Sequence, residues 1–147
     1  MPPGFSLVTL TYPALDGRPT ILTSIECLLT GRTFLFPMLV DTGSDRTSFP
    51  ASVAATFGHD NKHPRVKKAW CKGVGGRSRS YLHSVQVSLI HPTRASHQIV
   101  WRSSLPRADF VENLDCRFGL IGMDIIKQWK SVTMENSRHG LRIIIRI

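Results

Sequence analysis

The sequence predicts a single all-β domain over residues 1–147. Short runs rich in Val, Ile, Thr and Leu alternate apolar with polar residues, which is the period of a half-buried strand. Gly, Pro, Asp and Asn separate these runs and are typical of turns. An apolar content of 41% is enough for one hydrophobic core, but 147 residues are too few for two complete lobes.

The first part of the chain is expected to contain three strands joined by short turns. The first run alternates strictly between apolar and polar residues, as a strand with one solvated face does. The third run is almost entirely apolar, so we expect it to be buried on both of its faces. We place the strands at residues 5–12, 20–29 and 33–40, and the turns at residues 14–17 and 30–32.

Residues 50–68 are predicted to form one or two helical turns and then a loop. Pro50 suits the first helical position and Gly58 is a typical helix end, so the helical turns should cover residues 50–57. Residues 60–68 are polar and basic, and we expect them to be exposed.

The rest of the chain predicts a long hairpin, two short strands, a helix and a closing hairpin. The long hairpin has a glycine-rich tip at residues 72–77. Residues 123–130 have the spacing of a short helix, with Asp124 near its positive N-terminus. The strands are expected at residues 66–71, 80–90, 98–102, 118–122, 131–135 and 141–147, and residues 103–116 show no clear pattern.

One acid stands where a buried strand is expected to end. The strand at residues 33–40 leads into Asp41-Thr42-Gly43-Ser44, so the carboxylate of Asp41 can lie at the floor of a cleft. Gly43 lets backbone approach closely at no steric cost, and the hydroxyls of Thr42 and Ser44 can hydrogen-bond to backbone or carboxylate. Asp-Thr-Gly also occurs in ordinary turns, so a turn without a catalytic role is the alternative.

Two later elements follow in the order that a cleft enzyme would need. The tip from Gly73 to Gly76 predicts a mobile hairpin that closes over a bound chain and excludes water. Leu120-Ile121-Gly122 is an apolar-apolar-Gly element that can pass behind the loop of Asp41 and brace it. Each element is a weak signal alone, but their order and spacing together are specific.

These motifs resemble those of the retropepsins, the dimeric aspartic peptidases of retroviruses and their cellular and bacterial relatives. Asp41-Thr42-Gly43 is similar to the catalytic triplet, residues 72–77 to the flap, and Leu120-Ile121-Gly122 to the element before the C-terminal helix. The resemblance implies a closed β-barrel of the acid protease fold, as a single lobe with a flap hairpin and one short C-terminal helix. It implies catalytic residues Asp41, Thr42 and Gly43, and substrate-binding residues Ser44, Asp45, Gly73, Val74, Gly75, Gly76, Leu120 and Ile121.

The sequence departs from the retroviral pattern at Met123. Retroviral members carry Arg directly after the Gly of the third motif, where it pairs with an acid just past the catalytic triplet. Asp45 occupies the place of that acid here and therefore lacks the expected partner. Two hypotheses follow: Arg46 pairs with Asp45 instead, or Asp45 contacts substrate backbone.

The resemblance implies an aspartic endopeptidase that hydrolyses an extended polypeptide. This chemistry needs two carboxylates about 3 Å apart, because carboxylates that close share one proton. The chain has one Asp-Thr-Gly and no Asp-Ser-Gly, so a second Asp41 must come from another copy of the chain in a homodimer. We expect the terminal strands at residues 5–12 and 141–147 to pair between the two subunits.

Composition adds expectations about partners and location. The net charge of +9 favours acidic partners, so nucleic acid is a conceivable, though less expected, partner. No metal or other cofactor is expected, because His59 and His63 lie in a polar stretch typical of a solvated loop. Three separated cysteines do not suggest a disulfide framework. No apolar run reaches the roughly 20 residues of a membrane span and no signal peptide is evident, so we expect a cytoplasmic protein.

Two other functions stay open. The chain could be a catalytically silent domain of the same fold that binds peptides or acts as a scaffold. It could also be a basic nucleic-acid-binding module, in which residues 62–72 contact phosphates and Trp70 stacks on a base.

Overall fold

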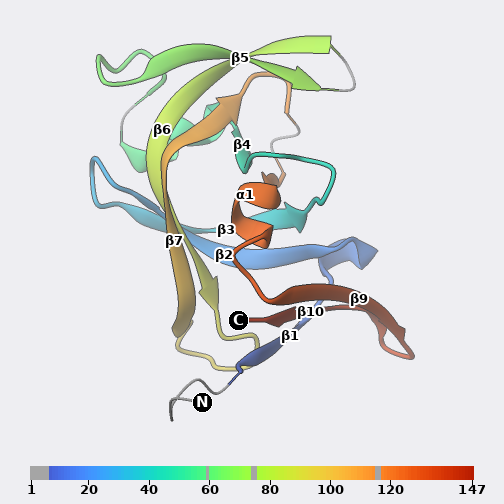
Figure 1. Cartoon of the computed structure of the whole chain (residues 1–147). Coiled ribbons are helices and arrows are strands. Elements are labelled where there is room, and N and C mark those ends of the chain that lie inside the picture. Colours follow the sequence, from blue (N-terminus) through green and yellow to red (C-terminus); the bar gives the residue numbers. More distant parts are fainter. Residues whose placement is uncertain (1–6, 59, 74–75, 115–116) are drawn as a thin grey trace, which may run out of the picture.

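The computed structural model describes residues 7–58, 60–73, 76–114 and 117–147. The chain is built almost wholly from strands, with a few short helical segments (Figure 1). Among the described residues, no helix is both long and apolar enough to cross a membrane. The elements are β1 (Thr9–Pro13), η1 (Leu15–Gly17), β2 (Thr20–Cys27), β3 (Thr33–Val40), β4 (Ser48–Pro50), η2 (Ala51–Phe57), β5 (Lys67–Gly73), β6 (Gly76–Ile90), β7 (Ile99–Val111), β8 (Gly119–Ile121), α1 (Met123–Ile126), β9 (Ser131–Ser137) and β10 (Gly140–Arg146).

The main sheet closes into a barrel, as the resemblance of the three motifs implies. Its seven strands follow the order β2-β3-β8-β4-β7-β6-β5, and an additional pairing of β2 with β6 joins six of them into a ring. Strand β5 stays outside this ring and pairs only with β6, which makes a hairpin that projects above the barrel (Figure 1). The all-β closed barrel with a hairpin of this kind is the architecture expected from the sequence.

Aromatic rings fill the part of the barrel below that hairpin. Phe49 stacks on Phe110 with ring centroids 4.9 Å apart, and Phe57 meets Phe110 edge to face at 5.9 Å. All three side chains are fully buried. Because each ring removes a large apolar area from water, this cluster ties β4, η2 and β7 together beneath the hairpin.

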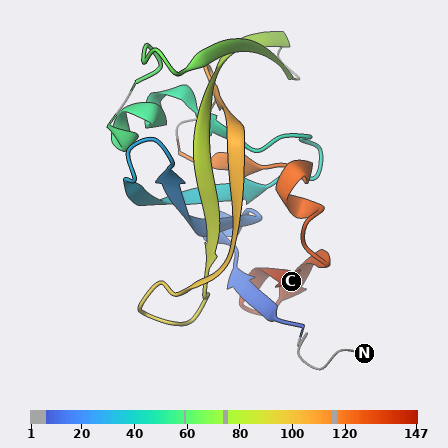
Figure 2. The same ribbon diagram turned by 60° about the vertical axis from the view of Figure 1, so that its left-hand side comes forward.

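Strand β7 explains the stretch that shows no clear sequence pattern. It runs through Ile99–Val111 beside β6, and the two long strands lie side by side in both views (Figure 2). The register shifts where His83 pairs with Ala108 but Val85 pairs with Leu105, so β7 carries one extra residue there. A bulge of this kind breaks the two-residue alternation, which hides the strand from a periodicity argument.

Several sequence-based bounds need correction. Strand β3 is not buried on both faces along its length, because Leu35 is 39% exposed and only Met38 and Val40 are fully buried. Helix α1 ends at Ile126 rather than at residue 130, since Lys130 already donates its N–H to the carbonyl of Arg146 and joins the terminal sheet. Strand β4 has only three residues, which is too short to produce a periodic signal.

The two ends of the chain form a separate three-stranded sheet. Its order is β1-β10-β9, with Thr9 opposite Arg146 and Pro13 opposite Arg142. We expected these terminal strands to pair between two chains, but they pair within one chain. Leu10, Ile143 and Ile145 are buried on its inner side, so apolar burial holds this sheet against the barrel.

Candidate active site

Asp41 lies immediately after β3, at the point where β3 meets β8. Its backbone N–H donates to the carbonyl of Ile121 at 3.0 Å, which continues the parallel pairing of Val40 with Ile121. The chain then turns tightly, because the N–H of Ser44 donates to the carbonyl of Asp41 at 3.2 Å. The N–H of Gly43 donates to Oδ1 of the Asp41 side chain at 2.9 Å. The turn therefore fixes one oxygen of the carboxylate while leaving Oδ2 available.

Gly122 passes directly behind this turn. A Cβ on Gly122 would lie 2.4 Å from the carbonyl carbon of Arg46, so only glycine permits the approach. The next two backbone N–H groups bind the same loop: Met123 donates to Ser44 at 2.7 Å and Asp124 donates to Asp45 at 3.1 Å. The expectation that the apolar-apolar-Gly element braces the acid's loop is met by these contacts.

The side chain of Asp124 completes the brace. Its carboxylate accepts the backbone N–H of Thr47 at 3.0 Å and the hydroxyl of Thr47 at 2.7 Å. The hydroxyl of Thr47 in turn accepts the buried N–H of Gly122 at 3.1 Å. The sequence predicts only that Asp124 lies near a helix N-terminus. Its contact with Thr47 cannot be predicted, because the two residues are 77 positions apart and local spacing does not report such a contact.

Arg46 pairs with Asp109 and not with Asp45, so the first hypothesis for Asp45 is wrong. Its Nε lies 2.9 Å from Oδ2 of Asp109, and its Nη2 donates to the carbonyl of Arg107 at 2.6 Å. Asp109 is 4% exposed, and its carboxylate also accepts the hydroxyl of Ser80 at 2.8 Å. This network ties the loop after Asp41 to β7 and to the base of the β5–β6 hairpin, while Asp45 is exposed.

A cleft of about 730 Å³ opens between the Asp41 turn and the β5–β6 hairpin. Of the sequence-predicted site residues, those that line it are Asp41, Gly43, Ser44, Asp45, Gly76 and Leu120. Thr42 is exposed in the same turn, and Gly73 ends β5 opposite Gly76. Ile121 lies in the core with no exposed surface, so it is not placed to touch a substrate. Val74 and Gly75 fall outside the described residues.

The cleft also contains side chains that the sequence did not single out as site residues. Its further lining residues are Arg46, Ser48, Trp70, Cys71, Lys72, Arg77, Ser78, Asp109, Val111, Glu112, Asn113 and Leu114. Burial, followed by the negative charge of Asp109, raises the pKa of the Cys71 thiol, and Arg46 partly offsets this. These residues come from β4, β5, β6 and β7 and from the segments that follow β3 and β7, and their convergence depends on the barrel and not on sequence spacing.

Among the described residues, no group of three or more His, Cys, Asp or Glu side chains is placed to hold a metal ion. His59, one of the two histidines weighed as metal ligands, lies outside the described residues.

Comparison with known proteins places the fold. No protein-family model and no curated protein matches the sequence. Among solved structures, the chain is similar to a retropepsin-like aspartic protease from Rickettsia conorii, with a TM-score of 0.54 and 11% identity over 96% of this chain and 92% of that one. It is also similar to the EIAV protease complexed with the inhibitor HBY-793, with a TM-score of 0.48 and 16% identity over 78% of this chain and 89% of that one. The chain therefore has the retropepsin-like aspartic protease fold.

Proposed function

We propose that this protein is an aspartic endopeptidase whose active site is completed by a second copy of the chain. The observation that carries the proposal is the position of Asp41. Its carboxylate lines the cleft, one of its oxygens is held by the N–H of Gly43, and its loop is braced from behind by Gly122 and Asp124. A side chain restrained this closely can be brought to a second carboxylate without further reorganisation.

The chemistry follows from two Asp41 carboxylates sharing one proton. Like charges about 3 Å apart cannot both ionise readily, so the pair holds one proton between them. The ionised member accepts a proton from water as the water attacks the scissile carbonyl carbon, and the protonated member donates to the carbonyl oxygen. These roles belong to the pair and not to either chain.

The placement of three elements supports a two-fold dimer. The loop between β3 and β4, the C-terminal end of β5 and the β9–β10 hairpin all lie toward the same side of the barrel, the right-hand side in Figure 1. A two-fold axis beside this face would bring each Asp41 turn against its mate, because an isologous contact joins identical surfaces. Thr42 and Gly43 are exposed in the single chain and are available for such a contact.

An extended polypeptide is the substrate that suits the cleft. Strand β5 is the edge of the main sheet, and the cleft runs between this hairpin and the Asp41 turn. A peptide there would offer its backbone to neighbouring backbone groups and its alternate side chains to the cleft walls. Ser44, Asp45, Gly76 and Leu120 are the expected substrate contacts among the residues that line the cleft.

The test is cleavage of denatured protein by the wild type and by Asp41→Asn, with the mass in solution measured on the same samples. Asp16→Asn is the matched control, since it makes the same chemical change in the exposed turn η1, at a positive φ that Asn tolerates. We expect a dimer that cleaves, loss of cleavage in Asp41→Asn, and full activity in Asp16→Asn. A fully active monomer would overturn the proposal.

The silent peptide-binding domain is the other outcome of this test. If peptide binding survives in Asp41→Asn while the wild type cleaves nothing between about pH 3 and pH 7, the fold serves binding and not hydrolysis. A co-purified dimer of one wild-type and one Asp41→Asn chain gives the sharper measurement. It should be inactive if both carboxylates are required.

A further inference from the structure

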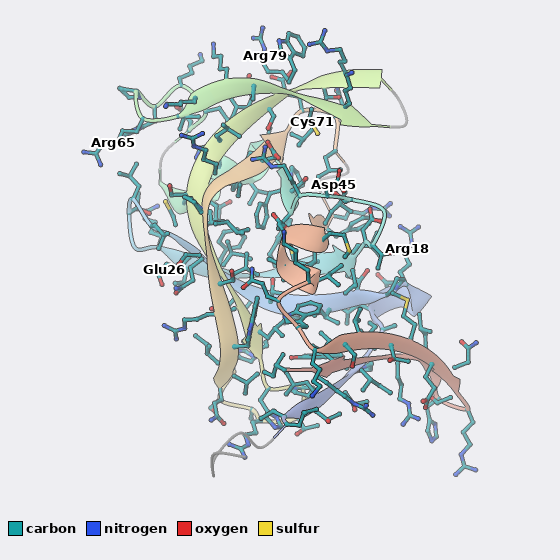
Figure 3. All side chains as sticks on the ribbon, in the orientation of Figure 1. Arg18, Glu26, Asp45, Arg65, Cys71 and Arg79 are labelled. Carbon is teal, nitrogen blue, oxygen red and sulfur yellow. The ribbon has the colours of Figure 1, made fainter. Side chains whose placement is uncertain are left out.

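The β5–β6 hairpin has two faces of different character. Its paired residues point to the same side, so Trp70 shares a face with its partner Arg79, and Lys72 shares that face with its partner Arg77. We call this row the outer face; it consists of Lys68, Trp70, Lys72, Arg77 and Arg79, all of them exposed. Among the alternate residues, Cys71 is partly buried and Ser80 is fully buried. Figure 3 shows Arg79 directed away from the barrel and Cys71 directed toward it.

An indole ring lies at the centre of the outer face. Trp70 is 59% exposed, which is the largest exposure among the large hydrophobic side chains of the described residues. The guanidinium carbon of Arg77 lies 5.3 Å from the ring centroid and that of Arg79 lies 5.6 Å from it. Both distances are within the range of cation–π attraction, so the two cations are held beside the ring. The outer face therefore offers a π-surface and positive charge at one place.

Acidic residues are scarce in the sequence around Trp70, so the positive charge there is not neutralised by close neighbours in the chain. Residues 61–108 contain no Asp or Glu, although they include β5, β6 and most of β7. Two acids from β7 and the residues after it reach the hairpin. Asp109 accepts the hydroxyl of Ser80 at 2.8 Å, and Glu112 accepts the hydroxyl of Tyr81 at 2.6 Å. The four cations of the outer face thus retain most of their charge toward solvent.

We propose that the outer face of the β5–β6 hairpin binds single-stranded nucleic acid. A base would stack on the exposed part of the Trp70 ring, and Lys68, Lys72, Arg77 and Arg79 would contact the phosphates on either side. Single-strand binding surfaces combine these two features, a stacking aromatic ring and a row of cations that follows the backbone. Side chains two residues apart on a strand are about 6.6 Å apart, so the row is extended as a single strand is.

An acidic polypeptide is the less favoured ligand for this face. It would use the four cations, but carboxylate side chains offer nothing flat to stack on an indole ring. A duplex is disfavoured for a related reason, because its bases are stacked on each other and hidden from Trp70. Stacking on Trp70 should therefore make this face bind a single strand more tightly than it binds other polyanions.

This binding would not use the residues proposed for catalysis. Asp41 lines the same cleft as Trp70, Lys72 and Arg77, but its carboxylate offers neither an aromatic ring nor a positive charge to a nucleic acid. Nucleic-acid binding should therefore survive Asp41→Asn unchanged. Its failure and the failure of the peptidase proposal are consequently distinguishable.

The test is fluorescence anisotropy with an end-labelled oligothymidylate of about 12 nucleotides, a length within the usual site size. We expect Trp70→Leu to weaken binding at least about tenfold and Trp70→Phe to restore most of the affinity. Arg77→Gln/Arg79→Gln should weaken binding and reduce the magnitude of the slope of log affinity against log salt by about 1.4. This is the change in counterion release expected when two phosphate contacts to a single strand are lost. The charge-matched control is Arg94→Gln/Arg138→Gln, at two exposed positions outside the hairpin, and it should change affinity by less than about twofold.

Three results would overturn the proposal. The first is that Trp70→Leu binds as the wild type does, which would leave charge alone as the cause. The control Arg94→Gln/Arg138→Gln could lose as much affinity as Arg77→Gln/Arg79→Gln, which would show that net charge and not this face is responsible. Polyglutamate of equal charge could compete as well as the oligonucleotide, which would assign the surface to acidic polypeptides instead.

Discussion

The carboxylate of Asp124 and the side chain and backbone of Thr47 form a two-point contact across 77 residues, at 2.7 Å to the hydroxyl and 3.0 Å to the N–H. Thr47 is 1% exposed and stands six residues after Asp41, whereas Asp124 belongs to α1. The contact therefore joins the loop of the candidate catalytic acid to the helix that follows β8. Both the stability of the fold and the position of Asp41 therefore depend on the side chain of Asp124.

Asp124→Ala should destabilise the protein by about 1–3 kcal/mol, since it leaves the buried N–H and hydroxyl of Thr47 without an acceptor. The free energy of unfolding in urea measures this. Asp124→Asn keeps one carbonyl oxygen as an acceptor, so its loss should be smaller. Equal stability in Asp124→Ala and the wild type would show that water replaces the contact.

The effects of changing Arg46 and Asp109 on the free energy of unfolding should be coupled, because the two side chains form an ion pair. Arg46→Met leaves the carboxylate of Asp109 buried without its cation, and we expect a loss of about 1–3 kcal/mol. Asp109→Asn should recover part of that loss in the double variant, because the uncompensated charge is then gone. A double-mutant cycle by urea unfolding measures the coupling. Strict additivity of the two single changes would contradict it.

Two glycines of the site should respond differently to a methyl group. In Gly122→Ala the new Cβ would meet the backbone of Arg46 at 2.4 Å, so the fold itself must shift and unfolding should occur at a clearly lower temperature. In Gly43→Ala the Cβ would lie 3.2 Å from Oδ1 of Asp41, which presses on the carboxylate and not on the core. Gly43→Ala should therefore lose cleavage with little loss of melting temperature. Circular dichroism and the cleavage assay separate the two effects.

Cys71 should react slowly with iodoacetamide. Burial, and then the charge of Asp109, raises its pKa, so the reactive thiolate forms only at a higher pH than in an unfolded chain. Peptide mapping after alkylation across a range of pH gives the profile for this thiol alone. The same chain in urea is the control and should show the ordinary profile. Identical profiles in the two states would argue against the assigned environment.

Stability should fall in alkaline solution because of Tyr12. Its hydroxyl donates to the carbonyl of Ile90 at 2.7 Å, and burial raises its pKa well above the ordinary value. The unfolded tyrosine loses its proton above about pH 10 while the folded one keeps it, so the unfolded state gains stability as pH rises. We expect a fall of about 1.4 kcal/mol per pH unit there, measured by urea unfolding. Tyr12→Phe should remove the largest part of this slope. Tyr81→Phe should remove less of it, because the hydrogen bond to Glu112 raises the pKa of Tyr81 by a smaller amount.

Local pattern is sufficient to predict an all-β chain with an acid at the end of a strand, and the resemblance of three motifs adds the closed barrel. Neither predicts the contacts that hold the acid. Alternation predicts most strands, and the glycine-rich tip predicts the hairpin of β5 and β6. The bulge opposite His83 hides part of β7, and with it Asp109, the partner of Arg46. Pairings such as Arg46 with Asp109 arise only when the barrel closes, so no spacing rule gives them.

The in-chain pairing of β1 with β10 bears on how an active enzyme would assemble. Each chain completes its own terminal sheet, so no strand has to be exchanged when two copies meet. On the proposed mechanism, dilution would then yield folded monomers. These would be inactive only because each lacks the second Asp41. Folding and activation would be separate events with separate concentration dependence, and a proteolytic site would not form until enough chains had accumulated.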